Sequence, residues 1–596
     1  MKVIIASPGH QIIKDLKESE NVNEVIKHRK LNGGYLIEFS EDKDNTIAGT
    51  LLEFEDKILN YSNVVNKGIE FWDFVTTSKG VINSLKERFG IEDIEVKGTS
   101  LDQFLGNTLT EKEVLILKTT LNMGYFNYPS MDEKRELKRE VLGTWLVASY
   151  GIAANAPIAV ATLYFVGIAG LAGGSMPLVT VLSYLIYATT LLVVYEWSKD
   201  IAASYGYVAM IKKGLNSSLA AFTVGYGYIY QYLVAGAAGF GVLGVASFLY
   251  LVSPSITSSM PWLWAVISVI VTLETTLIMW LGVKPGGMIN LIVGLISIAY
   301  LIVTSIALII MAGDKNTLAP FTAQPVNGNW VLILTSMIFG ITTFGGATTP
   351  VGVAEEAKIP KKTLPKALLL EFLVLGVGLI LNAYAQTVVY GVNNMFNYAN
   401  LPDPMVIIYS KYFGTITVLI LIVLVAFMFN SSTIAFATSG SRMIYGMARD
   451  GVLYPKTFAK INKYGVPGNA ILLTGIITGA LSLISGYILG PLEASIFLIT
   501  FGSFYVSLGH LFAAIALIKH KVKVKMINIV KHVLVPIVSS IAYILTIYFG
   551  TYPAPAFPLN IAVYAAWAVL LIHVILYYIL KSRNSDAIKK LGDFSL

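Results

Sequence analysis

Long apolar stretches recur through residues 142–580, and each is about 20 residues long and nearly free of charged side chains. An α-helix of about that length crosses a hydrocarbon core of roughly 30 Å. The pattern therefore predicts an all-α polytopic membrane protein. Its twelve expected transmembrane helices lie near residues 142–170, 177–197, 218–252, 261–282, 288–312, 330–352, 365–391, 414–440, 469–489, 491–517, 530–550 and 558–580.

The first 130 residues follow a different pattern, because they are rich in charge and their apolar runs are short. KVIIAS, GGYLIEFS and TIAGTLLEF are alternating or β-rich, whereas SKGVINSLKERFG has a helical spacing. We expect a small cytoplasmic α+β domain over residues 1–130, a transmembrane domain over residues 140–580 and a cytoplasmic tail over residues 581–596.

Two expected spans, the first and the sixth, contain helix-breaking residues at bilayer depth: GIAANAP at 151–157 and GITTFGGATTP at 340–350. An unpaired backbone group in lipid costs several kcal/mol, so a break must be covered by protein or line a polar cavity. Paired breaks at these positions are typical of two inverted five-helix repeats with a midplane site. Exposed N–H groups and carbonyls of the broken helices suit a zwitterion. The alternative is that these residues mark only kinks or close packing.

Composition supports a membrane protein, since 55% of the residues are hydrophobic, 13% are charged and the mean hydropathy is +0.67. The net charge of +7 comes from basic residues in alternate loops, such as 358–366 and 519–531. The positive-inside rule then places the protein in the plasma membrane as a multi-pass chain with both termini in the cytoplasm. Without cysteine, neither a disulfide nor a thiolate metal site can form. The start of the chain has too short an apolar run for a signal peptide.

Within residues 108–143, LTEKEVLIL and GYFNYP resemble the opening of the helix-turn-helix domain in archaeal regulators related to the bacterio-opsin activator. In that family a further helix enters the major groove. Here the chain runs from Leu142 into an apolar span, so the recognition helix is missing and nucleic acid is not an expected partner. A regulatory or stabilising appendage is the favoured interpretation.

Three stretches resemble the amino acid-polyamine-organocation superfamily of permeases: SYGYVAMIKKGLNSSLAAFTVGYGYIY (204–230), AEEAKIPKKTLPKA (354–367) and SRMIYGMARDGVLYP (441–455). The resemblance covers about residues 140–580. It implies the leucine-transporter-like inverted-repeat fold with discontinuous helices 1 and 6, and alternating access. It also implies a small-molecule substrate, usually an amino acid or amine.

The same resemblance assigns substrate binding to the two breaks, with Phe344 as an aromatic lid or, alternatively, a packing residue. The Gly-Phe-Glu triplet common in the family falls on Gly346, Ala347 and Thr348, so its carboxylate is absent and a neutral substrate is favoured. The expected binding residues are Ser149, Gly151, Ile152, Ala153, Ala154, Asn155, Ala156, Phe339, Gly340, Ile341, Phe344, Gly345, Gly346, Ala347 and Thr348.

The sequence does not decide whether transport is coupled to sodium, to protons or to exchange. No cofactor and no metal other than sodium is expected. Ser297 stands where some proton-coupled relatives have a lysine, while Ser431, Ser432 and Thr433 offer sodium ligands or simply bond their own helix.

Buried ionisable groups are the other coupling candidates. For Glu274, a role in coupling and a purely structural role are equally favoured. For Glu371, which could reach the interface, and for His510 and His573, a structural role is favoured. At the cytoplasmic face, Glu355, Glu356, Arg442, Arg449 and Asp450 could form exposed ion pairs that latch a gate.

The leading hypothesis is a secondary active transporter of amino acids, neutral ones foremost, or of related small amines. One alternative is a transporter-like membrane sensor that signals through residues 1–130, and another is a polyamine or cationic amino acid transporter. An enzyme is not expected, because no His/Glu metal pattern and no nucleophile with a base occurs within the spans. The sequence leaves the oligomeric state open.

Overall fold

The computed structural model describes residues 2–5, 22–31, 34–41, 58–66, 69–76, 79–89, 137, 141–552 and 554–594. The chain divides into two compact units, Met1–Tyr128 and Pro129–Leu596. Each unit is described by itself.

The described residues of the first unit form two antiparallel sheets and one helix. The three-stranded sheet has the order β1-β3-β2, and β4 and β5 pair as a separate antiparallel two-stranded sheet. Helix α3 buries Val81 and Leu85, which are four residues apart and so share one face. The elements are β1 (Lys2–Ile5), β2 (Val22–Leu31), β3 (Gly34–Glu41), β4 (Ile58–Asn66), β5 (Ile69–Thr76) and α3 (Lys79–Phe89).

Of the elements expected here, β1, β3 and α3 coincide with KVIIAS, GGYLIEFS and SKGVINSLKERFG. TIAGTLLEF and most of the helix-turn-helix-like segment at 108–143 lie outside the described residues. A folded α+β domain over residues 1–130 therefore stays a prediction.

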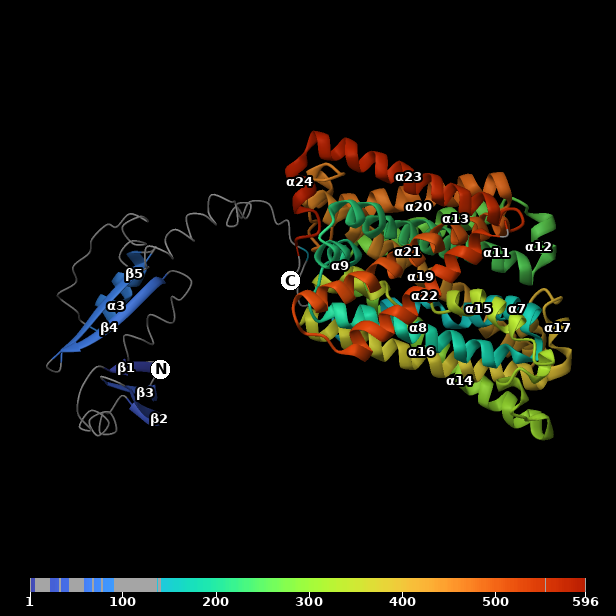
Figure 1. Ribbon diagram of the computed structural model, residues 1–596, viewed down its shortest axis with the longest axis horizontal. Helices are drawn as coiled ribbons and strands as arrows, with labels where there is room; N and C mark the ends of the chain where they lie inside the picture. The colour runs from blue at the N-terminus through green and yellow to red at the C-terminus, as the bar shows by residue number, and fades with distance from the viewer. Residues whose placement is uncertain are drawn as a thin grey trace. The chain divides into compact units, whose positions relative to one another are not determined.

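The second unit is a bundle of long helices that run roughly along one direction (Figure 1). Its main helices are α6 (Thr144–Asn155), α7 (Pro157–Ala172), α8 (Met176–Ser198), α11 (Leu243–Val252), α13 (Leu263–Trp280), α14 (Val283–Ala312), α15 (Trp330–Thr342), α16 (Pro360–Tyr390), α19 (Thr415–Arg449), α20 (Gly468–Leu489), α21 (Pro491–Lys523), α22 (Val535–Thr551) and α23 (Leu559–Arg583).

Shorter helices join these at the two ends. They are α9 (Gly206–Leu215), α10 (Ser218–Ala220), α12 (Pro254–Ser259), α17 (Met395–Tyr398), α18 (Pro404–Phe413) and α24 (Ser585–Lys590). The 3-10 or π segments are η2 (Gly173–Ser175), η3 (Ala221–Gly225), η4 (Tyr226–Tyr228), η5 (Gln231–Val242), η6 (Gly313–Lys315), η7 (Ala319–Phe321), η8 (Gln324–Val326), η9 (Thr349–Glu356), η10 (Val392–Asn394), η11 (Lys456–Ala459) and η12 (Val530–Leu534).

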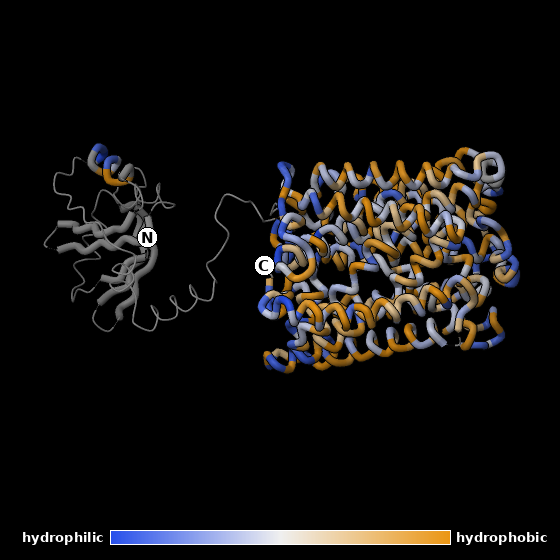
Figure 2. The backbone as a smooth tube through the Cα atoms, turned by 90° about the horizontal axis from the view of Figure 1, so that it is seen from above, coloured by the Kyte–Doolittle hydropathy of each residue, from blue (hydrophilic) through white to orange (hydrophobic). Residues whose placement is uncertain are grey.

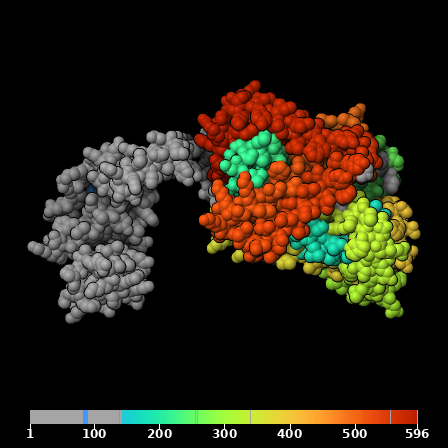
Figure 3. Space-filling view, in the orientation of Figure 1, coloured from blue at the N-terminus to red at the C-terminus, as the bar shows by residue number. Residues whose placement is uncertain are grey.

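Helix α6 begins at one end of the bundle, which we call the α6 end and which also holds α9 and α24 (Figure 1). Helix α7 leads to the opposite end, called the far end, where α12 and α17 lie. Within the unit, η5 packs against α19 and α21, and α6 packs against α14 and α16. The face shown in Figure 3 is covered mostly by C-terminal residues, those of α22 and α23 among them.

The surface of the bundle is that of a membrane protein. In the described part of the chain, ten segments are long and apolar enough to cross a bilayer; the first, Thr144–Ser198, contains α6, α7 and α8, and α15 is a shorter apolar helix. Large apolar side chains on the flanks are exposed, for example Ile310 by 73% and Ile416 by 76%. Hydrophilic residues gather at the two ends (Figure 2). The bundle is thus suited to lipid on its sides and water at its ends.

The first helix interruption lies between α6 and α7. Helix α6 ends at Asn155, Ala156 has left-handed backbone angles (φ 43°, ψ 63°), and Pro157 begins α7. Proline lacks the N–H that would continue α6 and disfavours a helical conformation at the residue before it. The chain therefore stops and restarts as a helix where GIAANAP predicts.

The second interruption follows α15. The helix ends at Thr342, residues 343–348 form turns, and the chain continues as the 3-10 segment η9. Pro350 stands near the start of η9, where a missing N–H costs little. The break lies where GITTFGGATTP predicts it, but a 3-10 segment replaces the expected second half of the α-helix.

Candidate functional site

The two interruptions meet inside the bundle. The side-chain carbonyl of Asn155 accepts a hydrogen bond from the backbone N–H of Gly346 at 3.1 Å, and its amide donates to the carbonyl of Gly151 at 2.9 Å. A Cβ atom at Gly346 would lie only 2.7 Å from the Asn155 nitrogen. The closeness of the two backbones thus requires glycine at position 346.

A pocket opens beside this crossing, and the centre of a water-sized sphere can occupy about 80 Å³ of it. It is lined by residues of both breaks and of five further helices. Its walls are Ala154, Asn155, Val160, Tyr164, Tyr187, Gln231, Ala235, Gly236, Phe240, Ile341, Thr342, Thr343, Gly345, Gly346, Phe436, Ile499, Ser503, Val506, Ser507, Tyr543 and Thr546. These are apolar or neutral polar residues, so a ligand would meet no charged side chain there.

The pocket extends from the breaks toward the far end. Val160 and Tyr164 lie on α7, which leads there, and Ile499 lies near the start of α21. Thr546 is likewise close to the last residue of α22. The pocket therefore lies on the far-end side of the two breaks.

Five of the residues expected to bind substrate line this pocket: Ala154, Asn155, Ile341, Gly345 and Gly346. They are the residues nearest the two helix ends, which is where the chain leaves regular helical hydrogen bonding.

Four other expected binding residues make contacts elsewhere. Ser149 donates to the carbonyl of Gly287 on α14, Gly151 packs on Glu371, and Ile152 packs on Gly294. Gly340 packs on Ser183. These residues, with the buried Ala153, Ala156 and Ala347, hold the interrupted helices against their neighbours.

Phe344 is buried and lies between Tyr184 and Tyr187, with ring centroids 5.4 and 6.0 Å away. Phe339 is 39% exposed and meets Gly167. Neither lines the pocket, so in this structure Phe344 takes the packing role and an aromatic lid at this position stays a prediction.

Thr348 shares a hydrogen bond with Tyr228 across 3.0 Å between their oxygens. Tyr228 in turn lies 3.4 Å from Nε2 of His510. The hydroxyl that replaces the carboxylate expected from the family thus joins a buried polar cluster behind the second break.

Most of the pocket wall comes from residues that sequence reasoning did not select. Phe240 and Phe436 supply aromatic surface, Tyr187 and Gln231 supply polar atoms, and Tyr543 comes from α22. These residues lie within ordinary apolar helices, where the local sequence has no break or motif to mark them.

The expected coupling residues fall in three places. The Ser432 hydroxyl lies 3.4 Å from the carbonyl of Ala154, beside the first break, whereas Thr433 donates to the carbonyl of Phe429 in its own helix. Ser431 and Ser297 are buried with no hydrogen-bond partner for their hydroxyls. No cluster of three or more His, Asp or Glu suited to a metal occurs among the residues that the structure describes.

Glu274 lies apart from the breaks, on α13, where both of its carboxylate oxygens accept from the side-chain amide of Asn430 at 3.1 Å. The carboxylate is on the exposed side of the helix. The structure therefore gives Glu274 a partner on α19 without bringing it to the pocket.

Two ion pairs close the α6 end. Arg442 donates to both carboxylate oxygens of Glu356 at 3.0 and 3.1 Å, and Arg449 donates to Glu355 at 3.0 Å. The expectation of exposed pairs is wrong, because Arg442 and Glu356 are fully buried where η9 packs against α19. Burial also raises the pKa of Asp450 to about 6, against the effect of Arg449.

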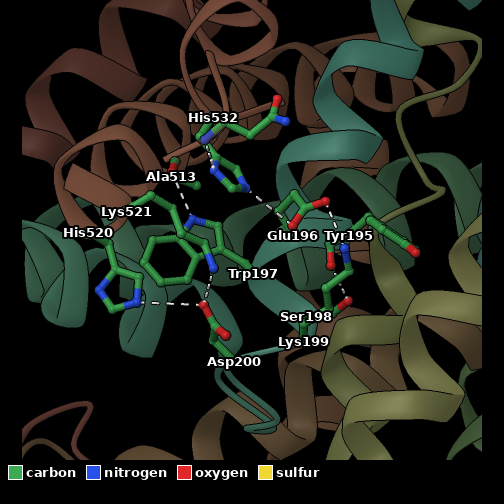
Figure 4. A network of polar contacts seen from close by, with 11 residues as sticks. Tyr195, Glu196, Trp197, Ser198, Lys199, Asp200, Ala513, His520, Lys521 and His532 are labelled. Carbon is green, nitrogen blue, oxygen red and sulfur yellow. Dashed lines mark hydrogen bonds and ion pairs between the residues drawn. The ribbon is translucent and has the colours of Figure 1, made fainter. Parts of the chain in front are cut away.

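Beside these pairs, a polar network ties α8 to α21 and η12 (Figure 4). Lys521 donates to Asp200 at 2.7 Å, and the ring of His532 lies 3.4 Å from Glu196. Trp197 donates to a backbone carbonyl of α21 at 2.9 Å. Helix α8 is thereby joined, at the α6 end and away from the pocket, to two elements that lie far from it along the chain.

A bundle of apolar helices with a central pocket between two interrupted helices has the architecture of a polytopic membrane transporter. The chain belongs to the amino acid permease family, whose profile matches residues 143–577.

Two curated relatives illustrate the family. The branched-chain amino acid permease BcaP of Lactococcus lactis is 24% identical over 216 residues, which are 36% of this chain and 45% of that protein. A probable amino-acid permease of Schizosaccharomyces pombe is 28% identical over 167 residues, 27% of this chain and 32% of that protein. The matches thus span less than half the length of these relatives.

Among solved structures, MhsT in complex with L-phenylalanine aligns with 69% of this chain and 99% of its own, at 16% identity and a TM-score of 0.49. A manganese transporter of Eremococcus coleocola aligns with 77% of this chain and 99% of its own, at 14% identity and a TM-score of 0.43.

Proposed function

We propose that the protein is a secondary active transporter of neutral amino acids across the plasma membrane. The observation that carries this proposal is the pocket at the crossing of the two interrupted helices, whose walls hold no charged side chain. Backbone groups at such helix ends bind the carboxylate and ammonium of a zwitterion through partial charges.

The rest of the pocket suits an apolar side chain. Val160, Phe240, Phe436, Ile499 and Val506 form its apolar surface. One relative is a branched-chain amino acid permease, which is in keeping with this chemistry. A polyamine or cationic amino acid would leave a charge without a partner, which is costly at this depth.

Alternating access is the mechanism that we assign to this site. The pocket extends toward the far end while ion pairs close the α6 end, as an outward-facing state requires if the α6 end is cytoplasmic. The excess of basic residues in the loops of that end supports this orientation, with both termini in the cytoplasm.

The proposed architecture has twelve crossings and two inverted five-helix repeats. In it, α6 with α7 and α15 with η9 are the discontinuous first and sixth helices. Residues 1–130 would act as a regulatory appendage on the cytoplasmic side, and the driving ion would be sodium or the proton.

Uptake into proteoliposomes that hold the full chain tests the proposal. We expect labelled leucine to accumulate against its gradient when an inward sodium or proton gradient is imposed, and putrescine not to accumulate. Ser503→Leu, which fills a half-buried wall position, should reduce leucine uptake at least tenfold. Ser582→Leu, the same change at an exposed position on α23, should have no effect.

Two outcomes contradict the proposal. Saturable leucine binding without accumulation under either gradient would favour a membrane sensor. Accumulation of putrescine in preference to leucine would show that the pocket selects a cation.

A further inference from the structure

A carboxyl group lies directly behind the first break. Glu371 on α16 is completely buried, and neither of its carboxylate oxygens has a hydrogen-bond partner. A methyl group at Gly151 would overlap this carboxyl, so Glu371 rests on the backbone of α6 one turn before Asn155. The expectation that Glu371 could reach the membrane interface is therefore wrong, because its side chain is enclosed by protein.

Helix α14, which carries further unpartnered polar groups, packs beside this position. Helix α14 packs on both α6 and α16, and its contacts of Gly287 with Tyr150 and of Gly294 with Ile152 bring Asn290 to the level of Gly151. The side-chain atoms of Asn290 and the hydroxyl of Ser297 are buried without partners. The interface thus contains polar atoms that no protein group satisfies.

Tyr187 on α8 connects this interface to the pocket. Its ring lines the pocket, and its buried hydroxyl has no hydrogen-bond partner. Helix α8 packs on α16 beside Glu371, since the hydroxyl of Tyr184 donates to the carbonyl of Phe372 at 3.1 Å. The Tyr187 hydroxyl, on the same helix, interacts electrostatically with Glu371.

The surroundings leave Glu371 no counter-charge. Tyr187 is the titratable group of α8 that faces it, and the hydroxyl of Tyr150 on α6 donates to the carbonyl of Val283. The carboxylates of η9, which also packs on α16, are engaged by Arg442 and Arg449. An ionised carboxylate without a partner is very costly in such a place, whereas the neutral acid is not.

We propose that Glu371 is the proton-binding group that couples substrate movement to a proton gradient, with the Tyr187 hydroxyl as its link to the pocket. This rests on the transport function proposed above. A proton from the far side adds to the Glu371 carboxylate and forms the neutral acid. The closed interface accommodates the neutral acid because it carries no charge. When the α6 end opens and water reaches Glu371, the O–H bond breaks and the proton leaves on the other side. One proton crosses for each cycle, and the substrate is not altered.

The test compares the wild type with Glu371→Gln in proteoliposomes. Glutamine keeps the shape of the side chain but cannot bind and release a proton. We expect Glu371→Gln to retain leucine-induced thermal stabilisation and leucine counterflow within about threefold. We expect it to lose proton-driven accumulation at least tenfold, together with the internal acidification that a trapped pH dye reports. Glu493→Gln, an exposed position at the start of α21, is the matched control and should behave like the wild type.

Tyr187→Phe is the second variant, since it keeps the ring and removes the hydroxyl. We expect it to slow proton-driven uptake severalfold while leucine still stabilises the protein. Proton-driven accumulation by Glu371→Gln within twofold of the wild type would overturn the inference. So would a wild type that is driven by sodium at uniform pH without internal acidification. Absence of both binding and counterflow in the wild type would instead overturn the proposed transport function.

Discussion

The Asn155 side chain holds the backbone of the second interrupted helix through the hydrogen bond from the Gly346 N–H, at 3.1 Å. Because Asn155 also donates to Gly151 one turn earlier, its amide plane is fixed from both sides. Two chain segments about 190 residues apart are thus joined at one point, and the pocket is built around it.

Gly346→Ala should disrupt this crossing. The added methyl group would lie 2.5 Å from the Ala154 carbonyl carbon and 2.7 Å from the Asn155 nitrogen, and neither backbone can yield without moving a helix end. We expect leucine uptake to fall by at least tenfold, measured in proteoliposomes. Gly550→Ala, where nothing lies within 4 Å of the new methyl group, should leave uptake unchanged. Near-normal uptake by Gly346→Ala would show that the breaks are not closely joined.

Asn155→Ala should weaken substrate binding and stability together. It leaves the buried N–H of Gly346 without an acceptor, at a cost of roughly 1–3 kcal/mol. Thermal unfolding in detergent, followed with and without leucine, should show a lower midpoint and a smaller leucine-induced shift. Asn469→Ala, which removes an exposed amide that donates to the carbonyl of Thr457, is the control and should change both values little. An unchanged leucine-induced shift in Asn155→Ala would show that Asn155 takes no part in leucine binding.

Arg442→Ala should destabilise the protein strongly. It leaves the fully buried carboxylate of Glu356 without its bidentate partner, and breaking such a pair costs about 3–5 kcal/mol. The pair of Lys589 and Asp586 is exposed, so Lys589→Ala should cost less than about 1 kcal/mol. Chemical unfolding of the two variants measures the difference. If both variants lose an equally small amount of unfolding free energy, water reaches the carboxylate of Glu356.

The stability of the segment between α16 and α19 should depend on the charge of Asp403. Burial raises the pKa of this carboxyl to about 7, against the backbone N–H groups of Val406 and Met405. A raised folded-state pKa means that the stabilisation is complete below about pH 4 and is lost as pH rises through about 7. The loss is a few kcal/mol at most.

Asp403→Asn keeps the N-cap acceptor of α18 and cannot ionise. Its midpoint of thermal unfolding should therefore change less between pH 4 and pH 8 than that of the wild type. Asp586→Asn, at an exposed position, should follow the wild-type curve. If Asp403→Asn follows that curve as well, Asp403 does not control the pH dependence.

The sequence predicts the interruptions well, because Pro157, Gly345, Gly346 and Pro350 act locally on the backbone. It predicts the apolar spans for the same reason, since length and hydropathy are local properties. It does not predict that η9 is a 3-10 segment. That difference arises where η9 packs against α19 and Glu356 pairs with Arg442, which are long-range contacts.

The pocket wall could be predicted only in part. Ala154 and Asn155 are adjacent to a break, whereas Phe240, Phe436 and Tyr543 are brought together by the packing of η5, α19, α21 and α22. The position of Glu371 could not be predicted for the same reason. Its distance along the sequence from a charged helix end suggests the interface, but the packing of α16 on α6 places it at Gly151.

One contact at the α6 end has a mechanical consequence. The backbone N–H groups of Val141 and Leu142 donate to the carbonyl of Glu356 at 3.0 Å, and Lys358 donates to the carbonyl of Leu142 at 2.9 Å. The chain that leads into the first interrupted helix is therefore hydrogen-bonded to the chain that leaves the second. A displacement of Val141 and Leu142 would therefore move the ends of both interrupted helices together.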